Sequence, residues 1–153
     1  MTLRAARLLG ALSVLGVGAV HLQQYATGYS TVPTIGTLFL LNAIGAGVVG
    51  FGLLVPWQRL LDERRSNVAV ATLSLAGLAI AVGSLIALFI SESGTLFGFS
   101  EDGYRSVIVI AIAVEAAATV LLAPLAVISI RRAASARSRR DPRAIRYAAS
   151  RSA

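Results

Sequence analysis

The chain has 153 residues, of which 56% are hydrophobic and 14% are charged, and its net charge is +7. Soluble domains are about 45–50% apolar and about 25% charged, so the composition excludes an ordinary soluble domain and indicates a membrane protein. The lack of cysteine excludes disulfides and thiolate metal sites, and the single histidine, His21, leaves too few nitrogen ligands for a typical zinc site.

Four apolar segments are each close to the roughly 20 residues that cross a bilayer as a helix. They cover residues 8–25, 35–57, 68–90 and 106–130. Open sheets would leave backbone groups unpaired in lipid, and barrel strands would alternate polar and apolar residues, which these segments do not. The first segment lacks the small-residue pair of a signal-peptide cleavage site, so we expect it to be retained. The sequence therefore predicts an all-α integral membrane four-helix bundle.

The distribution of arginine predicts the orientation of these helices. Thirteen of the fourteen basic residues, all of them arginine, lie before the first segment, between the second and third, or after the fourth. Arg105 alone lies in the loops of the opposite side. By the positive-inside rule, we expect both termini in the cytoplasm and the protein in the cytoplasmic (inner) membrane.

The two loops on the outer side suggest how the helices are connected. Pro33 ends the first loop, and Thr34 is a suitable side-chain cap for the second helix. The second loop is acidic and contains the run Phe97-Gly98-Phe99, which we expect to form a short interfacial turn. We expect an outer aromatic belt at the lipid–water interface, and its members are Tyr25, Tyr29, Phe97, Phe99 and Tyr104.

Each predicted helix contributes one polar side chain at a similar depth. At about 1.5 Å per residue, His21, Asn42, Ser84 and Glu115 lie roughly 20–24 Å from the cytoplasmic ends. We call these four residues the polar layer. It is predicted either to bind a small polar or cationic ligand or relay a proton, or to fix helix register through hydrogen bonds worth about 0.6 kcal/mol each. The sequence favours the structural interpretation.

Small residues in the second helix form two pairs spaced by four, Ala43 with Gly47 and Ala46 with Gly50. Such residues allow helices to approach closely in lipid. They indicate packing within one compact bundle, or equally a homodimer or a membrane partner protein.

Residues 131–153 form an arginine-rich tail that accounts for the whole net charge. Each basic residue near a membrane surface contributes about 1 kcal/mol of attraction to anionic lipid headgroups. The predicted headgroup contacts are Arg131, Arg132, Arg137, Arg139 and Arg140. Nucleic acid is not an expected partner, since Tyr147 is the tail's only aromatic residue for stacking on bases.

Two stretches carry a resemblance to known proteins. They are His21-Leu22 with residues 28–42 (GYSTVPTIGTLFLLN), and residues 96–101 (LFGFSE) followed by Glu115. This pattern resembles an uncharacterised family of actinobacterial four-helix integral membrane proteins, which implies the same fold and supplies no activity. Through Arg7-Leu8-Leu9-Gly10 the chain is also similar, more weakly, to DoxX-type membrane proteins.

The sequence predicts a multi-pass membrane protein with a structural or accessory role. The first alternative is a small ligand-binding or transport protein that uses Glu115, His21 and Asn42. The second is a redox-associated DoxX-like subunit, which the weaker resemblance implies. We predict no catalytic residues, no metal and no cofactor, because the sequence has neither a Ser-His-acid set nor a ligand cluster at plausible spacing.

Overall fold

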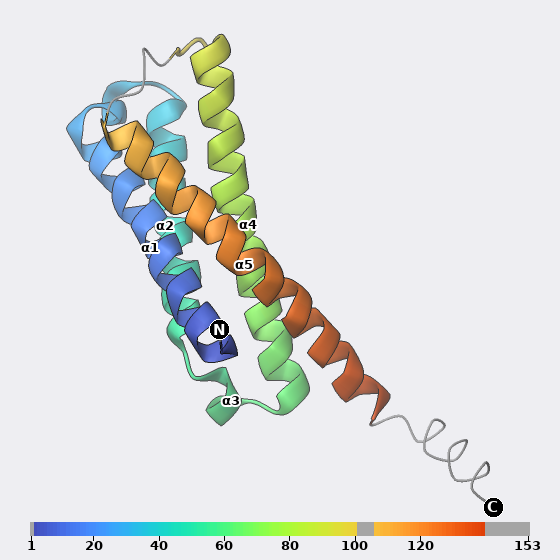
Figure 1. Ribbon diagram of the computed structural model, residues 1–153. Coiled ribbons are helices and arrows are strands. Elements are labelled where there is room, and N and C mark those ends of the chain that lie inside the picture. The colour runs from blue at the N-terminus through green and yellow to red at the C-terminus, as the bar shows by residue number, and fades with distance from the viewer. Residues whose placement is uncertain (1, 101–105, 140–153) are drawn as a thin grey trace, which may run out of the picture.

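The structure is a computed structural model and describes residues 2–100 and 106–139. In this part of the chain the fold is all-helical, as predicted (Figure 1). The elements are α1 (Leu3–Thr27), the 3-10 turn η1 (Tyr29–Thr31), α2 (Ile35–Leu54), α3 (Trp57–Leu60), α4 (Glu63–Ser93) and α5 (Ser106–Ser138). The helices α1, α2, α4 and α5 are long and apolar enough to cross a membrane.

Local signals explain where the helices begin and end. Thr2 accepts a hydrogen bond from the Ala5 amide at the start of α1 (3.2 Å), and Asp62 accepts one from the Arg65 amide at the start of α4 (3.1 Å). The helix α2 stops at Leu54, short of the predicted position 57, because Val55 precedes Pro56 and takes an extended ψ of 130°. A residue before proline is disfavoured in the helical region.

The four long helices differ in length. The 20 residues of α2 span about 30 Å, whereas the 31 of α4 and 33 of α5 span about 46 and 50 Å. Pro124 lies inside α5 without ending it, as transmembrane helices tolerate. The first eight residues of the arginine-rich segment therefore continue α5. Arg140 and the rest of that segment, like Arg105 and Tyr104, lie outside the described residues.

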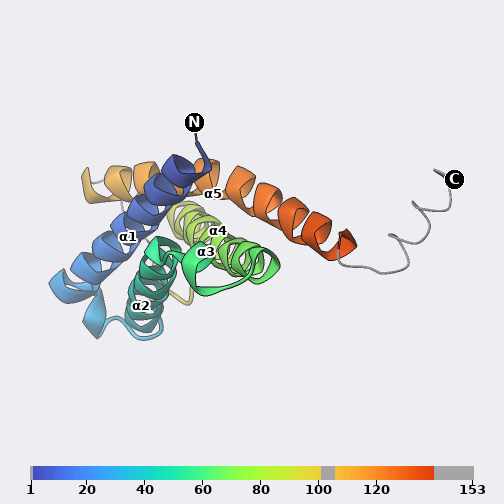
Figure 2. The same cartoon turned by 90° about the horizontal axis from the view of Figure 1, so that it is seen from below.

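The helices pack as two close pairs, α1 with α2 and α4 with α5, and α1 also contacts α5 (Figure 1). Contacts between α2 and α4 are less extensive. Viewed from below, α5 runs obliquely past α4, and its C-terminal end extends away from the other helices (Figure 2). All four long helices contribute to one apolar core, built from Ala11, Val14, Val17, Ala46, Val49, Leu53, Val70, Ala81, Ala118, Leu122 and Leu125.

The two predicted small-residue pairs of α2 differ in whether they contact another helix. A side chain at Gly50 would meet Leu15 of α1 at 2.6 Å, so this glycine allows the close approach of α1 and α2. Ala46 is fully buried at the same interface. Gly47, in contrast, has open space around it. The pair Ala46 and Gly50 therefore serves packing within the bundle, as small-residue faces do in lipid.

The first outer loop differs from the prediction. Tyr29 was expected in an interfacial belt, but its side chain is buried and its ring stacks on Phe39, with centroids 4.6 Å apart and planes at 6°. The loop folds back through η1, and this turns the ring inward. Thr34 precedes α2 but makes no capping hydrogen bond, and its φ of 64° lies in the left-handed region that β-branched residues rarely adopt.

The second outer loop contains the turn that the sequence predicts. Leu96 and Phe99 exchange backbone hydrogen bonds of 2.7 and 3.0 Å, and Phe97 and Gly98 between them have positive φ values of 52° and 78°. Two successive positive φ values are typical of a tight two-residue hairpin turn. Phe97 is exposed, whereas Phe99 packs edge-on against the ring of Tyr29 with centroids 5.5 Å apart.

Gly36 allows η1 to lie against the first turn of α2, because a side chain there would collide with the backbone oxygen of Tyr29. We expect Gly36→Ala to displace η1 and lower the free energy of unfolding by about 1–3 kcal/mol, as overpacking does. Unfolding with sodium dodecyl sulfate in mixed micelles measures this change. Gly47→Ala is the matched control in the same helix, and we expect it to be neutral or stabilising by up to about 1 kcal/mol. Equal losses in both variants would contradict this role of Gly36.

Candidate functional site

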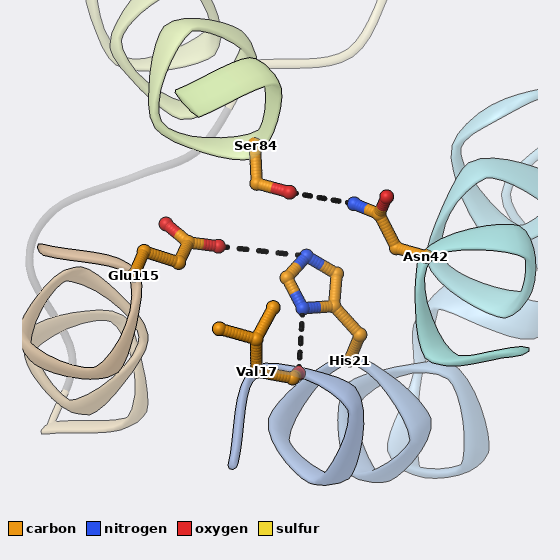
Figure 3. A network of polar contacts seen from close by, with 5 residues as sticks. All are labelled: Val17, His21, Asn42, Ser84 and Glu115. Carbon is orange, nitrogen blue, oxygen red and sulfur yellow. Dashed lines mark hydrogen bonds and ion pairs between the residues drawn. The ribbon is translucent and has the colours of Figure 1, made fainter. Parts of the chain in front are cut away.

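The polar layer predicted from depth is brought together in the interior of the bundle. His21 comes from α1, Asn42 from α2, Ser84 from α4 and Glu115 from α5, and their side chains point toward one another (Figure 3). His21, Ser84 and Glu115 are buried, and Asn42 is partly buried. The four helices thus meet at one polar level, as their common distance from the helix ends predicts.

Glu115 and His21 form a loose pair across α5 and α1. The Glu115 Oε1 atom lies 3.8 Å from His21 Nε2, which is too long for a hydrogen bond. His21 Nδ1 donates to the Val17 carbonyl oxygen at 2.9 Å. Because a carbonyl only accepts, Nδ1 carries a proton, and a neutral ring presents the lone pair of Nε2 to the carboxyl. Two facing lone pairs repel, so the pair accommodates one shared proton, on Glu115 or on Nε2.

Asn42 and Ser84 form the second pair, across α2 and α4. The Asn42 amide donates to the Ser84 hydroxyl at 2.6 Å. The Ser84 hydroxyl also lies on the side of α4 that faces the Glu115 carboxyl (Figure 3). Because the Ser84 oxygen accepts from Asn42, its own proton remains available on the side of Glu115. The two pairs are therefore one connected layer and join all four long helices.

The polar layer borders a cavity of about 110 Å³ in the half of the bundle that holds η1 and the hairpin turn. The walls are mostly aliphatic, with residues such as Ile35, Leu88 and Ile108. Gln24, one turn along α1 from His21, adds a second amide to the lining. The cavity thus has a mostly apolar lining with a minority of polar groups, among them the polar layer.

An aromatic cluster, made of Tyr29, Phe39 and Phe99, lines part of this cavity. The Tyr29 ring lies between Phe39 and Phe99 through the stacked and edge-on contacts described above. The ring of Phe39 also contacts the imidazole of His21, with centroids 5.1 Å apart. The aromatic cluster therefore connects the outer loops to the polar layer.

The aromatic cluster is a part of the site that the sequence predictions above do not include. A signal was present for Phe39, which precedes Asn42 by three residues and so shares its helix face. For Tyr29 and Phe99, helical periodicity offers nothing, since both lie in loops. Their inward direction depends on how each loop folds back over the helix ends.

One oxygen of the polar layer is left open. Glu115 is 2% exposed, and its Oε2 atom accepts no hydrogen bond from the part of the chain that the structure describes. Among those residues, no group of three His, Cys, Asp or Glu side chains could hold a metal ion. The arrangement offers an acceptor, an imidazole and an amide to one bound molecule, and a short path for a proton between Glu115 and His21.

A comparison with models of protein families, with curated proteins and with solved structures finds no match to this chain. The function must therefore be inferred from the geometry of the residues themselves. The family resemblance noted from the sequence stays a prediction.

The chain has no cysteine, so introduced pairs can be cross-linked without background. We expect the double variant Asn42→Cys with Ser84→Cys to be bridged by Hg²⁺ in membranes, because these side chains are in contact. The control pairs Asn42→Cys with Ser74→Cys, which is buried on α4 about 15 Å further along the helix. Mass spectrometry of the intact protein detects the bridge. Bridging of both pairs, or of neither, would contradict the polar layer.

Proposed function

We propose that this protein binds a small amphipathic molecule in the cavity beside the polar layer, with Glu115 as the polar anchor. The observation that carries the proposal is the open Oε2 atom of Glu115, which is buried, lines the cavity and accepts no hydrogen bond from the described residues. A buried polar atom without a partner costs about 1–3 kcal/mol. A ligand that donates a hydrogen bond to Oε2 recovers this cost.

The size and walls of the cavity restrict the ligand. An apolar protein cavity of about 150 Å³ is known to take up benzene, so about 110 Å³ suits one small ring or a short branched chain. Sugars and free amino acids need polar partners on every side, which the aliphatic walls do not offer. The ligand is therefore a molecule with an apolar body and one hydrogen-bonding head, such as a hydroxyl or an amine.

A structural role for the polar layer is the second candidate, and the Asn42–Ser84 hydrogen bond favours it. Bonds of this kind hold helices together at about 0.6 kcal/mol each. A layer selected only for packing, however, is expected to fill its surroundings and pair its carboxyl. The cavity and the open oxygen argue for binding over packing alone.

The location of the site follows from the proposed orientation. We infer that the protein lies in the cytoplasmic membrane with both termini in the cytoplasm, because thirteen of fourteen arginines lie on that side. The start of α1 and the end of α5 lie at the same end of the bundle (Figure 1). The cavity then lies in the outer half of the bilayer, beneath the outer loops.

Phenol combines a six-membered ring with one hydroxyl donor and is a suitable probe. We expect phenol to raise the thermal unfolding midpoint of the detergent-solubilised protein by about 2–4 °C for each kcal/mol of binding free energy. Toluene, which lacks the donor, should give a smaller shift.

The variant Glu115→Leu removes the acceptor at similar volume and should abolish the advantage of phenol over toluene. The matched control is Ser129→Ala, which removes another buried, unpaired oxygen of α5 away from the cavity. It should keep that advantage. Equal effects of phenol and toluene on the unaltered protein would show that Glu115 is no anchor.

The orientation is tested by labelling single cysteines with a membrane-impermeant maleimide. Phe97 and Ser138 are both exposed and lie at opposite ends of the bundle. In intact cells we expect Phe97→Cys to be labelled and Ser138→Cys to be protected until the membrane is permeabilised. The reverse pattern would contradict the proposed orientation.

A further inference from the structure

A second hollow lies at the opposite end of the bundle from the cavity. It has a volume of about 440 Å³, and we call it the arginine-end groove. Its lining includes residues of the C-terminal part of α5, the end of the helix that extends away from the other helices (Figures 1 and 2). Its lining residues are Leu3, Gln58, Leu61, Glu63, Ser66, Asn67, Arg132 and Arg139.

Two of the arginines of α5 are set apart by helix geometry. Arg132 and Arg139 are seven residues apart and so share one face of α5. Ser129 and Ala136 on the same face are buried against the bundle. All four arginines of this part of α5 are exposed, but only Arg132 and Arg139 line the groove, whereas Arg131 and Arg137 do not.

Hydrogen-bond donors in the groove outnumber their partners. Arg132 and Arg139 make no ion pair with any residue that the structure describes. Arg7 Nη1 donates to Gln58 Oε1 at 3.0 Å. Because a guanidinium only donates, this contact identifies the Gln58 oxygen and leaves the amide nitrogen of this lining residue free to donate elsewhere.

The acidic and hydroxyl groups of the groove are mostly accounted for. The Ser66 hydroxyl and the Asn67 amide both donate to the Glu63 backbone oxygen, at 3.0 and 2.8 Å. The Glu63 side chain is the one carboxylate in the lining, against two guanidinium groups. The groove is therefore net positive and rich in donors, which suits an anion that carries several acceptor oxygens.

The level of the groove indicates where such an anion comes from. The helices α4 and α5 are longer than the roughly 30 Å hydrocarbon layer, and the groove lies between their extended ends. Two exposed apolar side chains lie near lining residues along the chain: Val68 follows Asn67 in α4, and Ile128 precedes Arg132 by one turn of α5. They offer a surface for acyl chains immediately below a headgroup.

We propose that the arginine-end groove binds the phosphate of one membrane phospholipid. Arg132 and Arg139 hold the phosphate oxygens, and the Gln58 amide adds a further donor. Guanidinium groups suit this role because their planar donors match phosphate geometry. Glu63 lies where it accepts a hydrogen bond from a headgroup amine. This site is separate from the cavity at Glu115 and does not depend on the proposed function.

The test is native mass spectrometry of the delipidated full chain titrated with dioctanoyl phosphatidylglycerol. We expect one tightly retained lipid per chain. The double variant Arg132→Gln with Arg139→Gln should bind it about 30-fold more weakly, as the loss of two basic contacts near a membrane surface implies. The matched control, Arg131→Gln with Arg137→Gln, has the same change in net charge and should retain the affinity.

Additional variants and ligands in the same experiment distinguish specific binding from general charge attraction. Arg132→Lys with Arg139→Lys keeps the charge and should give intermediate affinity, and helical circular dichroism verifies that each variant is folded. Phosphatidylethanolamine should bind as well, since it shares the phosphate. Equal weakening in both glutamine variants would overturn the proposal. Displacement of the lipid by equimolar inorganic phosphate would also overturn it, because free phosphate would then be the ligand.

Discussion

The interior of a bilayer contains no water, so each polar group placed there needs a partner within the protein. The helices satisfy their own backbones, and most hydroxyl side chains in them do the same. Ser13, Ser74 and Thr119 each donate to a carbonyl one turn earlier in their own helix. Such local bonds need no neighbouring helix. Asn42, Ser84, His21 and Glu115 differ because their side chains face across helix boundaries.

The need of buried polar groups for partners within the protein also applies to the cavity beside Glu115. An empty apolar space in a bundle costs packing contacts. When an unpaired carboxyl oxygen borders the same space, the cost of a buried polar atom without a partner is added. The aromatic cluster lines part of this space, and Gly36 lets the loop that carries Tyr29 lie close to α2. The left-handed backbone of Thr34 lies in the same segment. The structure thus combines a strained backbone at Thr34 with a cavity that is bordered by the unpaired Glu115 Oε2 atom. Backbone strain is often found at binding sites.

The two ends of the bundle differ in how their helices relate to one another. At one end, η1 and the hairpin turn contribute side chains to the lining of a small cavity. At the other end, α5 continues past the core and leaves α4, and a wider groove is lined by arginine. The helices α4 and α5, which are longer than α2 and cross obliquely, contribute lining residues to both hollows.

The sequence by itself determined the four helices and the common level of the polar layer. Composition shows which segments suit lipid, and depth along a helix increases linearly with residue number. It could not determine that Tyr29 turns inward, that Thr34 fails to cap α2, or that Glu115 Oε2 stays open. Those features depend on the rotation of each helix about its axis and on how loops fold back over other elements. Only contacts between residues far apart in the chain decide them, and local periodicity carries no record of such contacts.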